Sequence, residues 1–580
     1  MMLTRLVFFS FLLSLWQCRP NGTPALKSDP GFGGLSLPEG FGALVVTDSS
    51  GRGRHLAVRS NGDVYIKLSS SDSEVGGIVA LRDTTEDGKA DQLIRFGWVD
   101  SIRGTYGTTM LIYGGHLYFA SALGVYRKQF LNDSELVPSG PTETVLLDDH
   151  AHGTHWHITK PMAFDRSGAM YVPFGAPSNS CQDLSKTPNG ASGGVGLDPC
   201  LELELHGGIW KFPANRLNLR QNDGVKVATG LRSIVGMQIS PLDDQLYVVM
   251  HGRDNLYSLY PDRYTAWQNA LLPAEELIKV KPGAHYGWPY CYYDQMEGKM
   301  MLAPEYGGNG QITSARCDTM EVPLMGFPGH WAPNDILFYQ GHQFPDRYRQ
   351  GVFIAFHGST NRTPYPQAGY FVAFVPFQNN QPTGWEVFAD GFAGVDTIVN
   401  TRDAKYRPVG LAEGPDGSLY ISDSNKGKIW RVFFTGNKAN FGEKQLALME
   451  QRKEKTHLKS PDPQKDDLQA HLDGGEKLYN TFCGTCHQMD GQGAAGRFPT
   501  LVNTDWVSGN KERLIRLTLF GLQGKIEVNG EVYDGVMPPH NFLNDEELAN
   551  ILTYIRQNFD NHSSPVTPDE IKQLRQITAQ

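Results

Sequence analysis

Two cysteines and a histidine near the C-terminal end of the chain have the spacing that attaches a haem covalently. They lie in the pentapeptide Cys483-Gly-Thr-Cys486-His487. Two thiols three residues apart can add to the two vinyl groups of one porphyrin, and the adjacent imidazole can then ligate the iron. A zinc half-site or a plain disulfide is the alternative for such a motif alone. The surrounding residues favour one covalent haem c.

These surroundings resemble class I cytochromes c. Residues 481–493 are similar to their haem-attachment segment, and Gly535-Val-Met537-Pro-Pro-His540 is similar to the loop that places a thioether on the opposite iron face. The resemblance therefore implies that His487 and Met537 are the two iron ligands. His540 is the competing candidate for the second position.

The same resemblance sets the domain boundaries at this end of the chain. Residues 544–558 are similar to the closing helix of the cytochromes. We expect a small all-α cytochrome c domain over residues 471–560, followed by a polar tail over residues 561–580 that could hold one extra helix.

The N-terminus has the features of an export signal. Arg5 is followed by an apolar run over residues 6–16, which is too short to span a bilayer in the mature protein. We therefore predict a signal peptide over residues 1–18 and a periplasmic or exported location, where covalent haem c is assembled. Leu15-Trp-Gln-Cys18 is similar to a lipobox, although Gln17 departs from the small residue expected there. A lipid anchor at Cys18 and ordinary cleavage further along the chain both stay open.

Four of the seven cysteines remain once Cys18 and the haem pair are set aside. An exported chain favours disulfides. Four cysteines allow three connectivities. We predict the pairs Cys181–Cys200 and Cys291–Cys317, because each is local in the sequence and closes one loop.

Length and charge exclude some classes of partner. The chain has 580 residues and a net charge of −10, and no basic block suits a phosphate backbone, so we expect no nucleic acid partner. The 64 glycines and 35 prolines, with 11% aromatic residues, are typical of a β protein rich in turns.

A repeated pattern precedes the cytochrome region. Five segments pair a turn with a short strand that carries tyrosine: residues 61–67, 115–120, 167–172, 243–249 and 416–422. Most are followed by a second strand that ends in a basic or aromatic residue, and residues 351–356 form a sixth strand candidate. Such repetition indicates propeller blades. We predict a mainly β, six-bladed propeller over residues 31–435, with a pair of β-sandwiches as the alternative, and a linker over residues 436–470.

Four stretches of the predicted propeller resemble the glucose/sorbosone dehydrogenase family, whose members use pyrroloquinoline quinone (PQQ). They are His157-Ile-Thr-Lys160 with the residues up to Val172, Gly230-Leu-Arg232-Ser233, Phe356-His-Gly-Ser-Thr-Asn361-Arg362, and Arg407-Pro-Val-Gly. The chain departs from the family at three positions: Lys160 stands for an arginine, Ser233 for an asparagine and Thr360 for a tryptophan.

The resemblance implies roles for six residues. His157 corresponds to the general base, and the PQQ-binding residues are Lys160, Arg232, Asn361, Arg362 and Arg407. These residue types suit the chemistry, because PQQ carries three carboxylates that arginine can bind in a bidentate manner. A neutral histidine can take the proton of a substrate hydroxyl while hydride leaves the same carbon.

Two further interpretations concern metals. His157 ends a run in which four histidines fall within eight residues, so a transition-metal site is the rival interpretation, and His155 is the next candidate for the base. Quinone enzymes of this family also bind Ca²⁺, which requires hard oxygen ligands. Residues 253–255 and 286–290 match loops near the family's cofactor, but the sequence does not identify the calcium ligands.

The resemblance implies an exported quinohaemoprotein oxidoreductase. It would oxidise a sugar or aldose with PQQ and pass the electrons to its own haem c, and then to a downstream periplasmic acceptor. A cofactor-free propeller that serves as a binding module for the cytochrome is one alternative. A lactonase-like hydrolase is another, but it would require a carboxylate-rich calcium centre.

Overall fold

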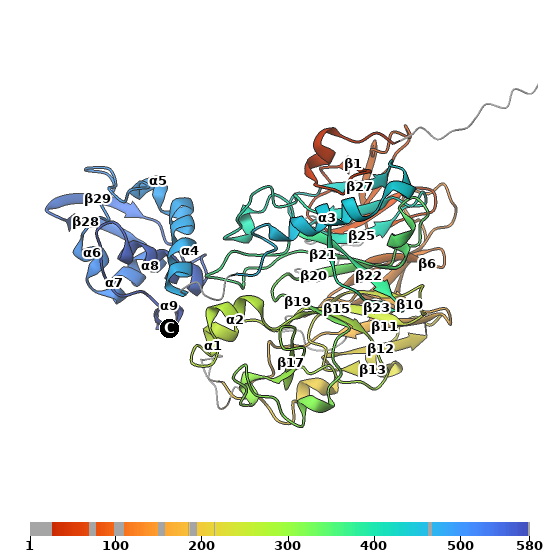
Figure 1. Ribbon diagram of the computed structural model, residues 1–580, viewed down its shortest axis with the longest axis horizontal. Helices are drawn as coiled ribbons and strands as arrows, with labels where there is room; N and C mark the ends of the chain where they lie inside the picture. Colours follow the sequence, from red (N-terminus) through yellow and green to blue (C-terminus); the bar gives the residue numbers. More distant parts are fainter. Residues whose placement is uncertain are drawn as a thin grey trace, which may run out of the picture.

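The computed structural model describes residues 26–68, 77–97, 109–148, 157–183, 185, 194–213, 215–461 and 467–577. The predicted signal peptide, Cys18 and His155 lie outside these ranges. Within them, no helix combines the length and the hydrophobicity that a bilayer crossing requires. Figure 1 shows the β-rich body and, at one side of it, the mainly helical C-terminal region in blue.

The body is the predicted six-bladed propeller, since six sheets of four main antiparallel strands lie in the described part of the chain. From first to last, the blades are β2 (Gly53–Val58), β3 (Val64–Leu68), β4 (Ile78–Arg82) and β5 (Gln92–Phe96); β6 (Met110–Tyr113), β7 (His116–Ser121), β8 (Gly124–Gln129) and β9 (Thr142–Leu147); β10 (Ala163–Phe164), β11 (Ala169–Phe174), β12 (Gly208–Pro213) and β13 (Val225–Thr229); β14 (Ile234–Ile239), β15 (Leu246–Met250), β16 (Glu275–Lys279) and β19 (Met325–Phe327); β20 (Pro333–Leu337), β21 (Gly351–Phe356), β22 (Phe371–Gln378) and β24 (Glu386–Ala389), with β23 (Gln381–Pro382) beside β22; and β25 (Pro408–Glu413), β26 (Leu419–Asp423), β27 (Ile429–Phe434) and β1 (Phe41–Thr47).

The last blade closes the ring with a strand from the other end of the propeller. β1 pairs antiparallel with β27, so that Phe41 lies opposite Phe434. Phe41 also packs edge-on against Phe344 and Phe388 of the fifth blade. This pairing ties the two ends of the propeller together, which leaves no free edge at the point of closure.

The repeated tyrosine pattern has a structural reason. In four blades an aspartate in the turn before the tyrosine strand forms an ion pair with the basic residue of the next strand. The pairs are Asp63–Arg82, Asp165–Lys211, Asp243–Lys279 and Asp416–Arg431, at 2.6–3.0 Å. In two of them the tyrosine hydroxyl also donates to the aspartate. The pattern therefore marks an ion pair that joins neighbouring strands in each of these blades.

Two excursions from the blades carry the disulfides. The predicted pairs Cys181–Cys200 and Cys291–Cys317 are both confirmed. Cys291 begins a hairpin made of β17 (Cys291–Asp294) and β18 (Lys299–Leu302), and two short helices precede it, α1 (Leu256–Leu259) and α2 (Ala266–Leu271).

The connection after the propeller is folded onto it as far as residue 461. α3 (Glu443–Gln451) packs against β24, and Met449 joins the core beneath the fifth and sixth blades. Arg452 donates to the carbonyl oxygen of Leu37 at 2.6 Å, and Leu458 is buried in a neighbouring core cluster. The stretch predicted as a linker is therefore anchored over most of its described length.

The C-terminal region is mainly helical, as predicted. Its elements are α4 (Asp467–Phe482), α5 (Gly484–His487), α6 (Asp505–Ser508), α7 (Lys511–Phe520), β28 (Leu522–Val528), β29 (Glu531–Met537), α8 (Asp545–Gln557) and α9 (Pro568–Ile577). α4 and α8 cross closely at Gly475, where a Cβ would lie 2.2 Å from the carbonyl oxygen of Asn550. α9 is the helix anticipated in the tail, and it packs on α8 and α7.

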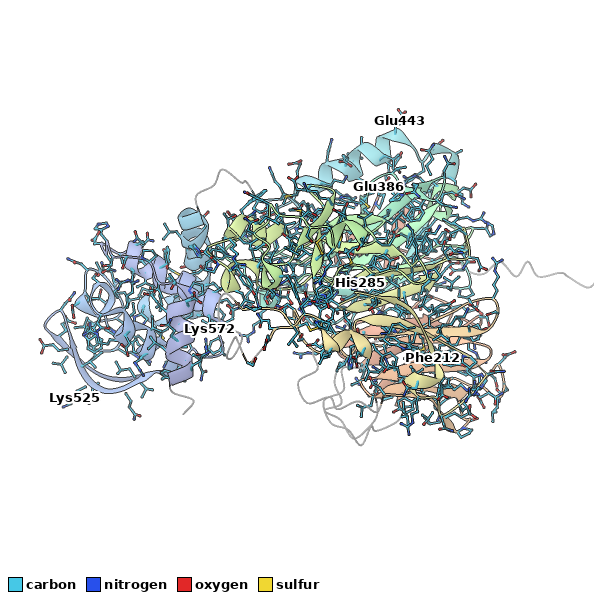
Figure 2. The ribbon with its side chains drawn as sticks, turned by 90° about the horizontal axis from the view of Figure 1, so that it is seen from below. Phe212, His285, Glu386, Glu443, Lys525 and Lys572 are labelled. Carbon is cyan, nitrogen blue, oxygen red and sulfur yellow. A yellow bond between two sulfur atoms is a disulfide. The ribbon has the colours of Figure 1, made fainter. Side chains whose placement is uncertain are left out.

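The β28–β29 hairpin is the one addition to the expected helices in this described region. Its turn is Asn529-Gly530, and both residues have positive φ. Asn-Gly in that conformation forms the two-residue turn that matches the twist of paired strands. Figure 2 shows Lys525 of this hairpin at the end of the molecule farthest from the propeller.

Candidate functional sites

The haem-attachment residues line an apolar cavity in the C-terminal domain. α5 carries Cys486 and His487, and Cys483 immediately precedes it; both cysteines are free thiols. His487 Nδ1 lies 2.9 Å from the carbonyl oxygen of Pro499. Because a carbonyl oxygen can only accept, Nδ1 carries the proton and Nε2 is left to bind iron. These residues fit a covalent haem c.

The same cavity offers two candidates for the second iron ligand. Met537 ends β29 and His540 follows three residues later, and both side chains line the cavity. The backbone N–H of His540 donates to the carbonyl oxygen of Thr518 at 2.9 Å, and its buried Nδ1 has no hydrogen-bond partner in the described structure. Met537 stays the prediction for this position, with His540 beside it.

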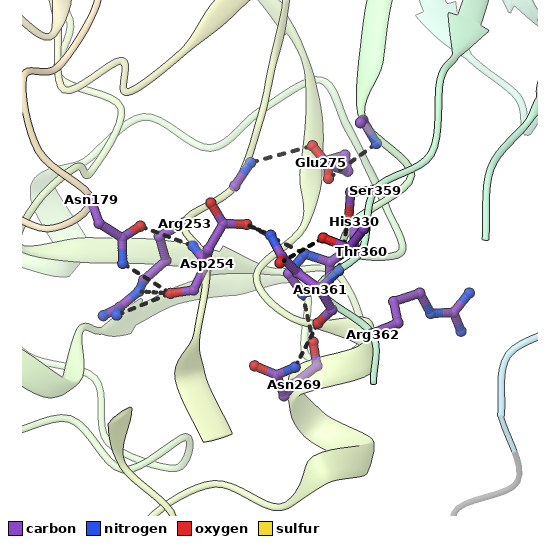
Figure 3. A network of polar contacts seen from close by, with 12 residues as sticks. Asn179, Arg253, Asp254, Asn269, Glu275, His330, Ser359, Thr360, Asn361 and Arg362 are labelled. Atoms are coloured by element: carbon purple, nitrogen blue, oxygen red, sulfur yellow. Dashed lines mark hydrogen bonds and ion pairs between the residues drawn. The ribbon is translucent and has the colours of Figure 1, made fainter. Parts of the chain in front are cut away.

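At the mouth of the propeller, polar side chains from three blades converge on Asp254 (Figure 3). Arg232 Nη2 lies 2.9 Å from one carboxylate oxygen, and Asn361 Nδ2 donates to the other at 2.5 Å. Asn179 Oδ1 accepts from both Arg232 Nη2 and the backbone N–H of Asp254. Arg232 precedes β14, Asp254 follows β15 and Asn361 follows β21, so strand ends bring these residues together.

The charges in this network fix its protonation state. Burial raises the pKa of Asp254, but the positive charge of Arg232, together with the influence of His330 and the hydrogen bonds from Arg232 and Asn361, lowers that pKa to about 2. The Arg232 guanidinium makes four hydrogen bonds, which end on Asn179, Gly252 and Asp254. Arg232 is thus largely committed to holding the network, and its predicted contact with PQQ stays a prediction.

His157 lies next to this network. Its Nδ1 is 2.7 Å from the carbonyl oxygen of Ala176. Burial, and then the charge of Arg232, lower its pKa well below 6.5. The imidazole is therefore neutral at neutral pH, as a general base must be.

Arg362 is a buried cation whose hydrogen-bonding capacity is largely unused. It is 2% exposed, and neither Nε nor Nη1 has a hydrogen-bond partner in the described structure. Figure 3 shows its side chain directed away from Asp254. Burial lowers its pKa to about 10, which still leaves it charged at neutral pH. A buried guanidinium with unmade hydrogen bonds indicates an anionic ligand.

A second cationic group lies at the start of the last blade. Arg407 donates to the carbonyl oxygens of His357 and Gly358, at 3.2 and 2.5 Å. Arg54, at the start of the first blade, is close enough that burial and the charge of Arg407 lower its pKa to about 10. The Arg54 guanidinium makes no hydrogen bond or ion pair with any described residue.

Sequence reasoning missed Arg54, because none of the four family stretches includes it. Its place in β2 could have identified it, because β2 lies beside β25, the strand that follows Arg407. Gly410 of β25 lets the two backbones approach closely, since a Cβ at Gly410 would lie 2.8 Å from the Arg54 carbonyl oxygen. Arg54 and Arg362 together supply positive charge that no described carboxylate neutralises, so these residues fit a ligand with several carboxylates, as PQQ has.

Lys160 has a different environment from the arginines. Its Nζ lies 2.6 Å from Asp148 Oδ2, and the two side chains are 2% and 3% exposed. The charge that the resemblance assigned to PQQ is therefore paired within the protein, and the assignment stays a prediction.

No calcium ligands can be assigned. Among the described residues, no group of three or more His, Cys, Asp or Glu side chains is placed to hold a metal ion. Asp254 has both oxygens occupied by Arg232 and Asn361, and Arg253 pairs with Glu305.

Known proteins of two kinds resemble this chain. Residues 35–433 match the TrAA12-like family and residues 472–559 match the cytochrome c family. Cytochrome c-552 of Thermus thermophilus is 40% identical over 110 residues, which cover 17% of this chain and 83% of the relative. The PQQ domain of pyranose dehydrogenase from Coprinopsis cinerea has the same fold, with a TM-score of 0.53, 18% identity, and coverage of 71% of this chain and 99% of that one.

A further relative matches only in part. An uncharacterized protein of Borreliella burgdorferi is 28% identical over 221 residues, 38% of this chain, and the match spans about half of that relative (51%). Both resemblances predicted from the sequence, to PQQ-dependent sugar dehydrogenases and to cytochromes c, are confirmed.

Proposed function

Since the chain belongs to the TrAA12-like family and carries a cytochrome c domain, we propose that it is a PQQ-dependent sugar or aldose dehydrogenase that reduces its own haem c. The observation that carries this proposal is the buried guanidinium of Arg362 at the propeller mouth, with two nitrogens that bond to no described residue. An ordinary structural arginine would have its donors satisfied.

The residues at the propeller mouth have separate roles in this reaction. PQQ, when bound, supplies a two-electron acceptor for the hydride of the substrate. Arg54 and Arg362 would hold its carboxylates, and Arg407 supplies a third positive charge beside Arg54. His157 Nε2 takes the proton of the substrate hydroxyl, and Asp254 is held ionised by Arg232 beside it. Together these charges orient the cofactor and leave His157 as the neutral base.

Electrons then have to leave in single steps. Oxidation of one hydroxyl releases two electrons, whereas a haem iron accepts one at a time. The cytochrome domain is joined to the propeller, so its effective concentration at the mouth is of about millimolar order. The β28–β29 hairpin, which lines the haem cavity, lies on the side away from the propeller (Figure 2), where a downstream acceptor could approach.

We also propose that the protein is exported to the periplasm, as the predicted signal peptide and the need of haem c for assembly outside the cytoplasm suggest. Anchoring through a lipid on Cys18 is a further proposal. A chain that retains residues 1–25, expressed with cytochrome maturation, would test both by fractionation and by mass spectrometry of its N-terminus.

The experiment that tests the function uses the purified haem protein. PQQ and Ca²⁺ are added, and the visible spectrum is followed before and after an aldose is supplied. We expect PQQ to bind, and the Soret band to shift to the reduced form at a rate independent of protein concentration. A protein that binds no PQQ would be the cofactor-free binding module instead. A rate proportional to protein concentration would mean that electrons pass between molecules.

A further inference from the structure

The loop that leads to Arg407 is also the loop that meets the cytochrome domain. It contains the short helix η8 (Thr401–Asp403), which Asn400 caps: its Oδ1 accepts from the backbone N–H of Arg402 at 2.9 Å. Asp403 Oδ2 in turn accepts from the backbone N–H of Asn400 at 2.9 Å. This reciprocal cap makes a rigid turn at the surface that faces the cytochrome.

The NH₂ group of the Asn400 side chain contacts the cytochrome domain. Its Nδ2 donates to Glu547 Oε1. Glu547 is the third residue of α8, and its Oε2 accepts from the backbone N–H of Asn544 at 2.9 Å. Asn400 is 8% exposed and Glu547 is 5% exposed. Two helix caps, one from each domain, are therefore joined by a single buried hydrogen bond.

Arg402 makes the adjacent contact, which reaches the wall of the haem cavity. Its guanidinium carbon lies 5.6 Å from the ring centre of Phe542. The Phe542 ring in turn lies 5.6 Å from Phe482 and 5.7 Å from His540. Phe482 and His540 both line the haem cavity. The propeller loop and the cavity wall are thus in continuous side-chain contact.

The loop of Arg362 makes a second contact with the same domain. Two residues after Arg362, the carbonyl oxygen of Pro364 faces Gly474 of α4, where a Cβ would lie 3.0 Å away. Val399 completes the interface by packing against the hydrophobic core of the cytochrome domain. The loops that carry Arg362 and Arg407, two of the three predicted PQQ-binding arginines, therefore touch the cytochrome domain.

We infer that the Asn400–Glu547 contact docks the cytochrome domain in the position from which it accepts electrons from the propeller. This inference rests on the proposed function. Each substrate molecule loses two electrons and two protons, and each electron reduces one ferric haem to ferrous. The second transfer follows after the first electron has passed to an external acceptor, so the docked position is used twice in each turnover. Because electron transfer slows steeply with distance, undocking would slow haem reduction without changing the chemistry at the propeller mouth.

The test uses a substitution that removes only the donor of the contact. Asn400→Asp keeps a side-chain oxygen for the η8 cap, since Asp and Asn are equally good caps, but places a carboxylate against Glu547. Glu547→Gln keeps the α8 capping box, which accepts either residue. In the double variant the amide introduced at position 547 can donate to the carboxylate introduced at position 400, so the contact is rebuilt in the opposite direction. In Asn400→Asp alone, a proton shared by the two carboxylates would restore a hydrogen bond between positions 400 and 547. The measurements are therefore made at pH 8 and pH 9, where the carboxylates do not keep such a proton.

Three quantities are measured in the full-length protein. We expect Asn400→Asp to slow substrate-driven haem reduction by about tenfold or more, the cost of a buried unpaired charge. Aldose oxidation by an added dye and the haem spectrum should not change. Amide hydrogen exchange of residues 399–404 and 543–548, measured without PQQ, should rise. The double variant should restore both the haem reduction rate and the exchange protection. Glu547→Gln alone should lower both, because its one carbonyl oxygen caps Asn544 and its NH₂ group then faces the NH₂ group of Asn400.

The outcomes separate this inference from the proposed function. If exchange rises in Asn400→Asp but haem reduction keeps its rate, electrons do not require the docked position and the inference is wrong. If neither changes, the contact does not hold the domains together and the inference is equally wrong. A wild-type protein that oxidises no aldose with the dye would refute the proposed function alone, while hydrogen exchange would still decide whether the contact docks the domains.

Discussion

His157 donates from Nδ1 to the carbonyl oxygen of Ala176 at 2.7 Å, and this contact decides which ring nitrogen can take a proton. A carbonyl has no hydrogen to give, so Nδ1 carries the proton and Nε2 has the free lone pair. Burial and the charge of Arg232 keep the ring neutral. Position and charge state therefore both suit the role of general base.

Replacing this histidine should remove catalysis without removing the cofactor. We expect His157→Ala to lower the turnover number for aldose by about 10²–10⁴-fold, the usual cost of losing a positioned base. The arginines remain, so PQQ should still bind. Dye reduction gives the rate, and the visible spectrum of the loaded protein gives the bound cofactor.

His116→Ala is the matched control, because that histidine begins β7 in the second blade and bonds to the carbonyl oxygen of Gly114. It should leave the rate unchanged. Full activity in His157→Ala would transfer the role to His155, which lies outside the described residues.

The pH dependence of kcat/KM should reflect the lowered pKa of His157. A base works only when unprotonated, and the pKa of His157 is lowered well below 6.5. The acid limb of kcat/KM should therefore fall below pH 6.5, with no loss between pH 8 and pH 6.5. A profile measured from pH 4 to pH 8 checks this, and a half-maximal rate at or above pH 6.5 would contradict the geometry.

Arg54 should contribute to cofactor affinity. Its guanidinium makes no hydrogen bond with any described residue and lies beside Arg407. A charge-assisted hydrogen bond is worth about 1.5–3 kcal/mol, so Arg54→Ala should raise the dissociation constant of PQQ by about tenfold to a hundredfold. Titration of the PQQ-free protein with PQQ, followed by fluorescence, measures it.

Arg52→Ala is the control for Arg54, because Arg52 is exposed and two residues away. An unchanged dissociation constant in Arg54→Ala would place the PQQ carboxylates elsewhere in the mouth.

The propeller could be predicted because its signal is local. The turn aspartate, the tyrosine strand and the basic residue of the next strand recur in the sequence. In the structure the aspartate and the basic residue form an ion pair, as in Asp165–Lys211. The disulfides were predictable for the same reason, since each joins cysteines close in sequence.

The details of the propeller mouth depend on contacts between distant segments. A family resemblance assigned Lys160 and Arg232 to PQQ, but it could not show that Asp148 and Asp254 pair with them. Arg54 lies far from Arg407 in sequence, and only closure of the ring brings the first and last blades together. The Asn400–Glu547 contact is likewise invisible in the sequence, because an asparagine and a glutamate at helix starts are ordinary caps.

The haem itself gives the last prediction. The protein, matured in a host that assembles cytochrome c, should contain one covalent haem, because the chain holds a single Cys-x-x-Cys-His motif. Met537→Ala should then remove the sulfur–iron absorption and lower the reduction potential, since a thioether ligand favours the ferrous state. Met489→Ala is the control, because that methionine is 62% exposed and lies on the surface near α5. A pyridine-haemochrome assay counts the haem, and near-infrared spectra with a redox titration follow the ligand. An unchanged spectrum in Met537→Ala would assign the position to His540, whose buried Nδ1 has no partner in the described structure and whose ring lines the same cavity.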